Sequence, residues 1–397
     1  MHVLFVNLPK IRNKYVTVFG MIDYSATPTF LLMLAKQEAD KGNKISFVDL
    51  QINPNAKIPS ADKLVTIFYT GCYKEHKKIF DEMLVNQGEN IKKETYLYPL
   101  EKIFLKEKVP RAMFELIDVT KYSVIDTYLS LYCPNKCTFC VKTMSQNPVI
   151  YKDMNDYLEE IKYLESKNIK KVSFSDPEFT INRKRVLEFT ENYKKNNFNV
   201  QYEITTRADY LDEEIIKALK KTNCYQVDIG IERASDRELA KIRKNMTYKK
   251  IKQTLKFLKK YKVRAGGFFI FGFPDDNHKT YERMKKKILE LDLNTGRVNY
   301  FTPYPNTDVW QECVQHDLID KNLKKETDTF SHQEFAICGT RYLTKEQVNK
   351  YVEKLNNILI ISTKLPKLKF LVKSKTISKI ISHLIQKIAI LTKKLRR

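Results

Sequence analysis

Three cysteines crowd into the segment LYCPNKCTFC, where Cys133, Cys137 and Cys140 have the spacing C-x3-C-x2-C. Thiolates so placed on one loop can ligate a metal centre. A structural zinc site normally takes four protein ligands, usually as two pairs from separate loops. No second pair exists here, because the other four of the seven cysteines are scattered singly. Three ligands therefore predict a reactive metal centre with one open position.

The elements that must position this loop lie between residues 122 and about 310. Buried-strand patterns recur at 122–132, 170–176, 199–207, 226–232, 265–272 and 296–303, with amphipathic helical segments between most of them. This alternation predicts a partial (β/α)6 barrel of the TIM type. The cysteines directly follow its first strand, which puts them at the carboxyl ends of the strands, where such barrels do their chemistry.

Residues before about 120 alternate strands and helices at the spacing of a parallel sheet. Strand patterns occur at His2–Pro9, Lys44–Leu50 and Leu64–Gly71, and helices are expected over Thr29–Gly42 and about His76–Val85. This predicts a small Rossmann-like domain without the G-x-G-x-x-G fingerprint of dinucleotide sites. The expected α/β architecture is thus a Rossmann-like domain over 1–120, the barrel over 121–323 and a helical extension over 324–397.

The charge of the chain is strongly positive, at +24, and is most concentrated at the C-terminus. Residues Lys364–Arg397 contain eleven Lys or Arg and no Asp or Glu, with apolar residues at helical spacing. Such a helix can lie on an anionic membrane surface, with its lysines near lipid phosphates. RNA binding is disfavoured, because the tail has little aromatic or Arg content. No signal peptide or membrane-spanning run is recognised, which predicts a cytoplasmic protein, peripheral on the inner face of the membrane.

The cysteine loop resembles the signature of the radical SAM enzymes, which includes an aromatic residue before the last cysteine, here Phe139. The resemblance implies a [4Fe-4S] cluster held by Cys133, Cys137 and Cys140, with S-adenosylmethionine (SAM) on the fourth iron. It further implies reductive cleavage of SAM, abstraction of a hydrogen atom from a substrate, and an acidic electron donor, a flavodoxin or ferredoxin. An iron–sulfur and SAM enzyme of this kind belongs to the oxidoreductases or transferases and works anaerobically.

Further stretches resemble family segments that contact SAM. FSDPEF stands where a Gly-Gly-Glu-like stretch is usual and offers acceptors for the methionine amine. TTRADY offers a partner for the methionine carboxylate. DIGIER resembles a Gly-Ile-Glu-Ser stretch of the family, with Arg in place of Ser. GGFFIFGFPDD resembles a segment that lies against adenosine, with two aspartates where Gly-Glu is usual. The SAM contacts implied by these segments are Asp176, Glu178, Arg207, Glu232, Gly267, Ile270 and Gly272.

A Rossmann-like domain before the barrel also resembles the cobalamin-binding radical SAM enzymes. In many of them an Asp-x-His-x-x-Gly loop supplies a histidine ligand to cobalt, and no such loop exists here. His2 and His76 are in other contexts. We therefore expect a degenerate scaffold domain and a protein without stoichiometric cobalamin, although some members bind cobalamin without that histidine.

The main prediction is a radical SAM enzyme that acts on a small or lipid-linked substrate. A cobalamin-dependent radical SAM methyltransferase is the alternative within enzymes. Methylthiotransferases are disfavoured, since their N-terminal domain carries three further cysteines and this one has only Cys72. The alternative of another class is a non-catalytic, metal-stabilised protein that binds a membrane or nucleic acid. The substrate, the reaction outcome and the oligomeric state do not follow from the sequence.

Overall fold

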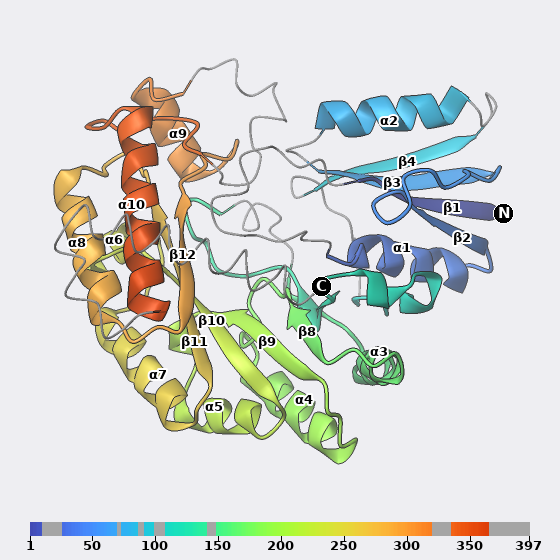
Figure 1. The fold of residues 1–397 in the computed structure, drawn as a ribbon, viewed down its shortest axis with the longest axis horizontal. Helices are drawn as coiled ribbons and strands as arrows, with labels where there is room; N and C mark the ends of the chain where they lie inside the picture. Colours follow the sequence, from blue (N-terminus) through green and yellow to red (C-terminus); the bar gives the residue numbers. More distant parts are fainter. Residues whose placement is uncertain are drawn as a thin grey trace.

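The computed structural model describes residues 1–9, 26–69, 73–85, 91–98, 108–140, 148–319 and 335–364. It confirms the predicted architecture: a smaller parallel sheet, a six-stranded parallel partial barrel and a C-terminal helix (Figure 1). The basic tail lies outside the described residues after Lys364, so its membrane binding stays a prediction. Within the described residues, no helix is both long and apolar enough to cross a membrane. The predicted domain boundaries at 120 and 323 stay predictions.

The smaller sheet has the strand order β2-β1-β3-β4, and its strands pair in parallel. β1 is buried almost throughout because four successive apolar residues, Val3–Val6, face core on both sides. β4, an edge strand, was not predicted. The elements of this region are β1 (His2–Asn7), α1 (Thr29–Asp40), β2 (Lys44–Asp49), β3 (Lys63–Tyr69), α2 (Tyr73–Val85) and β4 (Lys92–Tyr98).

The barrel sheet has the order β12-β11-β10-β9-β8-β5 and is parallel throughout. The strands are β5 (Asp126–Thr127), β8 (Lys171–Phe174), β9 (Gln201–Thr206), β10 (Cys224–Glu232), β11 (Arg264–Phe271) and β12 (Thr295–Tyr300). The outer helices are α3 (Met154–Ser166), α4 (Arg183–Lys195), α5 (Glu213–Lys220), α6 (Asp236–Lys241), α7 (Tyr248–Lys260), α8 (His278–Glu290) and α9 (Asp308–Gln315). The side-chain caps of α4, α5, α7 and α8 come from Asn182, Asp212, Thr247 and Asn277.

The single strand expected over residues 122–132 is broken in two. β5 joins the barrel sheet, whereas β6 (Ser130–Leu131) pairs antiparallel with β7 (Ile150–Tyr151). The break occurs at Tyr128 and Leu129, both buried. It turns the chain out of the barrel sheet just before the cysteine loop.

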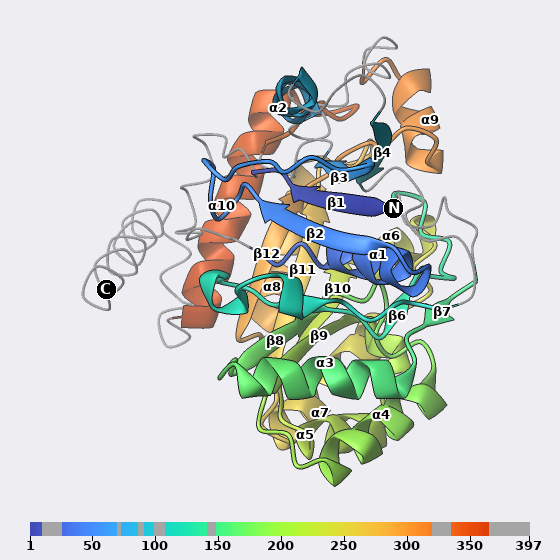
Figure 2. The same ribbon diagram turned by 90° about the vertical axis from the view of Figure 1, so that its right-hand side faces the viewer.

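The two sheets share one core. The short helix η3 (Phe114–Leu116) packs between α1 and α3 (Figure 2), and Thr29 Oγ1 donates to the carbonyl of Asp126 in β5 at 2.9 Å. Thr29 begins α1, which is the crossover after β1, so the carboxyl edge of the smaller sheet lies beside the first barrel strand. In Figure 1 the strands of the smaller sheet run toward the barrel.

The other edge of the barrel is covered by α10 (Lys345–Lys364). Its Asn356 side chain pairs with the backbone of Val298 in β12 through two hydrogen bonds of 2.8 Å. The amide thus satisfies an edge strand that would otherwise present open hydrogen-bonding groups.

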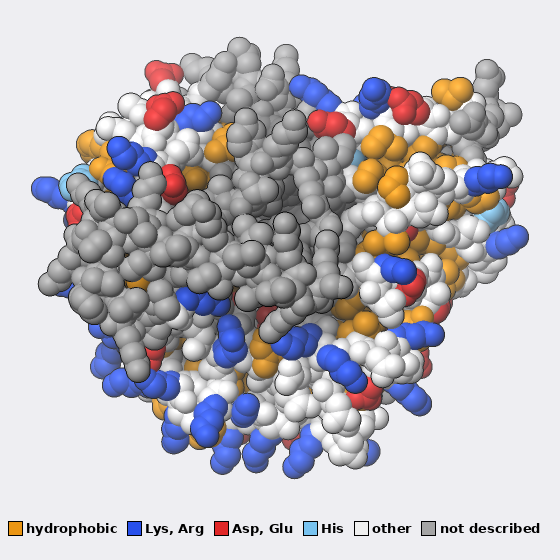
Figure 3. Space-filling view, in the orientation of Figure 1, with side chains coloured by type: hydrophobic (Ala, Val, Ile, Leu, Met, Phe, Trp, Pro, Cys, Tyr) orange, Lys and Arg blue, Asp and Glu red, His pale blue; other side chains and the backbone are white. Residues whose placement is uncertain are grey.

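Lys and Arg side chains crowd the lower rim of Figure 3, over α4, α5 and α7.

Candidate active site

The cysteine loop is held in place by backbone hydrogen bonds from two other parts of the barrel. The N–H of Thr138 donates to Ile242 O at 3.2 Å, and the N–H of Val309 donates to Thr138 O at 3.3 Å. Cys133, Cys137 and Cys140 are partly exposed and form no disulfide. Phe139 packs edge-on against Phe273, with ring centroids 5.6 Å apart. The loop is therefore braced, and its thiols stay accessible.

The donor set fits a multi-iron cluster. Among the described residues, no three His, Cys, Asp or Glu side chains converge on a position for a single ion. A cluster does not need such convergence, because each thiolate bonds to a different iron. Burial raises the pKa of the Cys137 thiol to about 11, while the nearby Lys244 and Arg207 cations act in the opposite direction. The cations favour the thiolate, the form that binds iron.

Arg207 lies against the cysteine loop. Its Nη1 donates to Asn135 Oδ1 at 3.1 Å, and Asn135 Nδ2 in turn contacts Cys133 Sγ at 3.2 Å. The rest of the guanidinium is paired with Asp209 through bonds of 2.9 and 2.8 Å. The resemblance implied that Arg207 contacts the SAM carboxylate, and this stays a prediction. In the structure its guanidinium contacts Asn135 and, through it, the first cysteine.

Asp176 and Glu178 have different surroundings, although both were expected to be acceptors for the SAM amine. Both oxygens of Asp176 accept bonds from the chain before the cysteine loop, from the N–H groups of Leu129 (3.0 Å) and Ser130 (2.6 Å) and from the Ser130 hydroxyl. Burial raises its pKa to about 6. Asp176 therefore holds the broken first strand.

Glu178 keeps one oxygen available. Its Oε1 accepts from the Arg207 N–H at 3.2 Å and from the hydroxyls of Thr206 and Thr180. Within the described part of the chain no hydrogen bond reaches Oε2. Burial raises the pKa of Glu178 to about 7. Of the two candidate acceptors, Glu178 is the one with a free carboxylate oxygen for an ammonium group.

Glu232 ends β10 at an irregularity. The strand register shifts between Gly230 and Glu232, and Glu232 has φ +62°, a strained conformation for this residue. Its Oε1 accepts from Lys244 Nζ at 2.8 Å. Lys244 is only 5 % exposed and was not predicted from the sequence. The bulge thus turns Glu232 toward a buried cation beside the cysteine loop.

The remaining predicted positions lie on β11 and the loop after it. A Cβ on Gly267 would come within 2.6 Å of Leu293 Cδ1, so this glycine serves close packing between β11 and its neighbours. Ile270 is buried, and its carbonyl accepts from Arg233 Nη1 at 3.2 Å. Gly272 has φ +110°, which other residues rarely adopt. Of the three, only Gly272 has a backbone shape that requires glycine.

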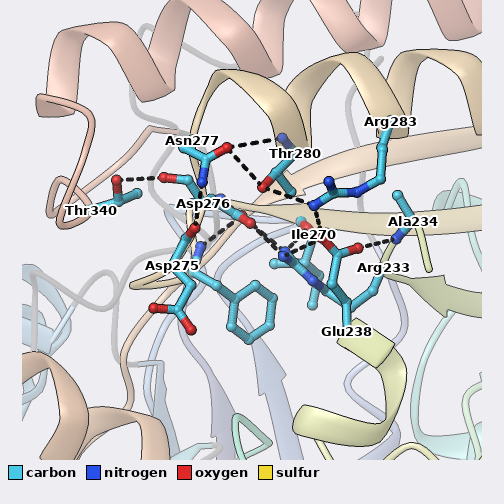
Figure 4. A network of polar contacts seen from close by, with 12 residues as sticks. Arg233, Ala234, Glu238, Ile270, Asp275, Asp276, Asn277, Thr280, Arg283 and Thr340 are labelled. Atoms are coloured by element: carbon cyan, nitrogen blue, oxygen red, sulfur yellow. Dashed lines mark hydrogen bonds and ion pairs between the residues drawn. The ribbon is translucent and has the colours of Figure 1, made fainter. Parts of the chain in front are cut away.

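Arg233 and Asp276 form a buried ion pair (Figure 4), with Nη1 2.9 Å from Oδ2 and a second, shorter contact between Nη2 and Oδ1. Asp276 Oδ2 also accepts from the N–H groups of Gly272 (2.8 Å) and Phe273 (3.0 Å). Arg233 stands where the family pattern has Ser, whereas Asp276 stands where it has Glu, so the arginine is the new charge. Its guanidinium neutralises a carboxylate that is buried beside it.

Asp228 on β10 is a further buried carboxyl group of the barrel. Its two oxygens accept hydrogen bonds from the Gln226 amide at 3.1 and 3.3 Å. Gly266 leaves the room for it, since a Cβ there would overlap Asp228 Oδ1. Burial, with a contribution from the neighbouring Glu203 carboxylate, raises the pKa of Asp228 from 3.8 to about 7. The folded protein thus binds this proton more tightly than the unfolded chain does.

Asp228→Asn is expected to increase the free energy of unfolding at pH 8 by ~2 kcal/mol, since a carboxyl with a raised pKa destabilises the fold when ionised. In the parent protein the destabilisation by Asp228 is absent below about pH 4, where the carboxyl is protonated in both states, and is complete above about pH 7. The difference in free energy of unfolding between the variant and the parent should therefore decrease as the pH is lowered. Urea unfolding of both proteins at pH 8 and pH 5 measures it. Glu82→Gln, on the exposed side of α2, is the control. An equal effect of Asp228→Asn at both pH values would contradict the prediction.

Comparison with known proteins gives matches along much of the chain. Residues 127–288 match the model of the Radical SAM superfamily. An uncharacterized methyltransferase of Pyrococcus horikoshii is 27 % identical over 256 residues, which cover 62 % of this chain and 55 % of the relative. The chain spans about half the length of the curated relatives it matches.

Two solved structures share the fold. The radical SAM methyltransferase TsrM of Kitasatospora setae, with cobalamin and a [4Fe-4S] cluster bound, has a TM-score of 0.66 at 12 % identity, covering 80 % of this chain and 78 % of TsrM. The cobalamin-dependent SAM radical enzyme OxsB, with aqua-cobalamin bound, has a TM-score of 0.68 at 13 % identity, covering 98 % of this chain and 71 % of OxsB. At 98 % of this chain, the OxsB match includes the smaller sheet as well as the barrel.

Proposed function

Because this chain belongs to the radical SAM superfamily and is a radical SAM enzyme, we propose that it is a cobalamin-dependent methyltransferase. The observation that carries the proposal is the extent of the fold match, since 98 % of the chain aligns with a cobalamin-dependent enzyme. The methyltransferase relative supports the same reaction class. The sequence analysis expected a scaffold domain without cobalamin. We now favour its alternative, a cobalamin-dependent radical SAM methyltransferase. The comparisons give no support to a non-catalytic binding protein.

The cluster and SAM would be held by groups described above. Cys133, Cys137 and Cys140 supply the thiolates, while Asp176 and Asn135 fix the loop that carries them. Glu178 Oε2 lies free for the methionine ammonium, and the Gly272–Asp276 turn presents backbone to the adenosine side. When bound, this pair of cofactors supplies the reductive cleavage of SAM that the family uses.

The smaller sheet has unsatisfied acceptors at its carboxyl edge. Asp49 Oδ2 and Gln51 Oε1, at and just after the end of β2, are buried and receive no hydrogen bond from the part of the chain that the structure describes. Burial raises the pKa of Asp49. Cobalamin carries many amide N–H donors around its ring, so these acceptors fit it. When bound, cobalamin supplies a cobalt centre that can carry a methyl group to carbon.

His2 and His76, the described histidines of this region, are not available to bind cobalt at this edge. His2 lies at the amino end of β1, the opposite edge, where Nε2 contacts Ser46 Oγ at 2.8 Å. His76 is fully buried, and its Nε2 contacts Pro9 O at 2.9 Å. These positions support a mode of binding in which the protein contacts the amide groups of cobalamin and neither histidine takes part.

Full-length protein reconstituted anaerobically and incubated with hydroxocobalamin should retain about one cobalamin per chain after gel filtration. Asp49→Leu should weaken binding ~10-fold, because it removes a buried acceptor at the carboxyl edge. Asp62→Leu is the matched control at the amino edge, where Asp62 accepts from the His2 N–H. Absorbance of the bound corrin measures the stoichiometry. No retained corrin, with SAM cleavage intact, would favour the cobalamin-free alternative, hydrogen abstraction from a substrate without methyl transfer.

The substrate and the electron donor remain predictions. A small or lipid-linked acceptor and an acidic flavodoxin or ferredoxin follow only from the sequence analysis. The first barrel strand β5 and the carboxyl edge of the smaller sheet meet at Thr29 and Asp126. This contact supports a proposal in which the two cofactor regions lie next to each other. A substrate carbon bound between the proposed SAM region and the proposed cobalamin region would be accessible from both cofactors.

A further inference from the structure

The end of the barrel opposite the cysteine loop is basic. The barrel strands are parallel, so the segments that lead into β8, β9, β10 and β11 meet at one edge, the amino edge. Exposed lysines lie at the ends of α4 and α5 and in the loops before β8 and β11. Figure 3 shows Lys and Arg side chains along this rim. We call this surface the amino-end face and define it by Lys170, Lys194, Lys195, Lys220, Lys221 and Lys262.

The amino-end face keeps its charge, because its lysines lack carboxylate partners. None of the six forms an ion pair within the described ranges, and Lys220 Nζ donates at 3.5 Å to a carbonyl, that of Lys262. Lys259, on the same edge, shows the contrast, since Asp292 neutralises it at 2.6 Å. The six ammonium groups are therefore available to an anionic partner.

Helix stability accounts for only part of this charge. A cation near the C-terminus of a helix interacts favourably with the helix dipole, which explains Lys194 and Lys195 in the last turn of α4. Lys170 and Lys262 lie in the loops after α3 and α7, beyond the last turn, where the dipole contributes little. The face thus carries charge that its helices do not need.

Helix α10 ends on the same side of the barrel. Asn356 pairs with Val298 in β12, and a Cβ on Gly296 would lie 3.2 Å from Leu359. Residue numbers therefore rise along α10 as they fall along β12, so the helix runs toward the amino edge. Lys364, from which the basic segment 365–397 continues, lies on that side. Two basic parts of the chain thus meet at one end of the barrel.

The chemistry of the amino-end face fits a membrane with anionic lipids. Its cations are all lysines, which act as point charges on flexible stems and need only a surface of negative potential. Nucleic acid is bound preferentially by Arg, whose planar guanidinium matches phosphate, and by aromatic side chains on which bases stack. Among the described residues, no large aromatic side chain is exposed on this face. The apolar residues at helical spacing in the segment after α10 also suit a lipid interface.

We propose that the amino-end face binds an anionic membrane surface, together with the basic segment that follows α10. The inference does not depend on cobalamin or on methyl transfer. In this arrangement the carboxyl ends of the barrel strands, with the cysteine loop, point away from the lipid. The substrate then reaches the site from solution, which favours a small acceptor over a lipid-linked one.

Sedimentation of the anaerobically reconstituted full chain with phospholipid vesicles tests the proposal. The parent should pellet with phosphatidylcholine vesicles that contain about 30 % phosphatidylglycerol but not with pure phosphatidylcholine, and high salt should weaken the binding. The fourfold variant Lys194→Gln, Lys195→Gln, Lys220→Gln and Lys221→Gln should bind at least about 10-fold more weakly, because each lysine near an anionic surface contributes a factor of about five.

The matched control neutralises four exposed lysines near the smaller sheet, which have no ion pair among the described residues, by Lys44→Gln, Lys57→Gln, Lys92→Gln and Lys93→Gln. Both variants have the same net charge and keep residues 365–397, so a difference between them belongs to the amino-end face. The control should bind within about 3-fold of the parent. Unchanged SAM cleavage in solution shows that both variants are folded.

Equal vesicle binding by the two variants would overturn the inference, as would a parent protein that does not pellet with anionic vesicles. Binding of unfractionated tRNA is measured in parallel. A loss of tRNA affinity in the face variant, with its vesicle binding unchanged, would also overturn the inference and assign the face to nucleic acid. None of these outcomes affects the proposed function, which is tested by corrin retention.

Discussion

Replacement of any one of Cys133, Cys137 and Cys140 by Ala should lower the iron content of the reconstituted protein from about four per chain to well below one, and abolish SAM cleavage. The three thiols are partly exposed on one braced loop and form no disulfide. Each thiolate would hold one iron of the cluster, so two remaining ligands are not expected to retain it. Iron analysis and the charge-transfer absorbance of the cluster measure the loss.

Cys313→Ala is the matched control for the triad. Cys313 is buried in an apolar cluster with Phe273 and Trp310, away from the loop ligands in sequence. Its removal should leave about four irons per chain and change only stability, by the ~1 kcal/mol of a small cavity. Full iron content in the triple Cys-to-Ala variant would show that the iron is held by other groups, and would overturn the assignment of the three cysteines.

Arg233→Met should destabilise the fold by about 3–5 kcal/mol, because it leaves the carboxylate of Asp276 buried without its partner. Arg233 is 4 % exposed and Asp276 is 0 % exposed. The pair also fixes the backbone N–H groups of Gly272 and Phe273, so the turn beside the proposed adenosine site should loosen. Urea unfolding at pH 7 measures the loss, and SAM affinity should fall as well.

The double variant Arg233→Met with Asp276→Asn should recover part of the stability, since no uncompensated charge then remains. Arg283→Met is the control, because the Arg283–Glu238 pair is half exposed on its arginine side and should contribute below ~1 kcal/mol. Losses of similar size for Arg233→Met and Arg283→Met would mean that the buried pair has no special role.

The sequence predicted the order of the barrel strands, the cysteine loop at their carboxyl ends and the smaller parallel sheet. These predictions depend on local features: apolar runs of strand length, helical periodicity and the spacing of three cysteines within one loop. β4 was missed because Lys92–Tyr98 is an edge strand that starts with charged and polar residues, and none of residues 92–96 is fully buried. The broken first strand was missed since Tyr128 and Leu129 continue the apolar pattern through the turn.

The roles of the site residues were decided by the tertiary structure. Asp176 and Glu178 look alike in FSDPEF, yet the first holds the chain at Leu129 and Ser130 and the second keeps a free oxygen. Arg233, which stands in place of the usual Ser, pairs with Asp276 across 43 residues of sequence. Lys244 had no motif that marked it. Its burial beside Glu232 depends on the chain reversal after α6 and on the absent side chain of Gly230, and such long-range contacts are not encoded in the local spacing of residues.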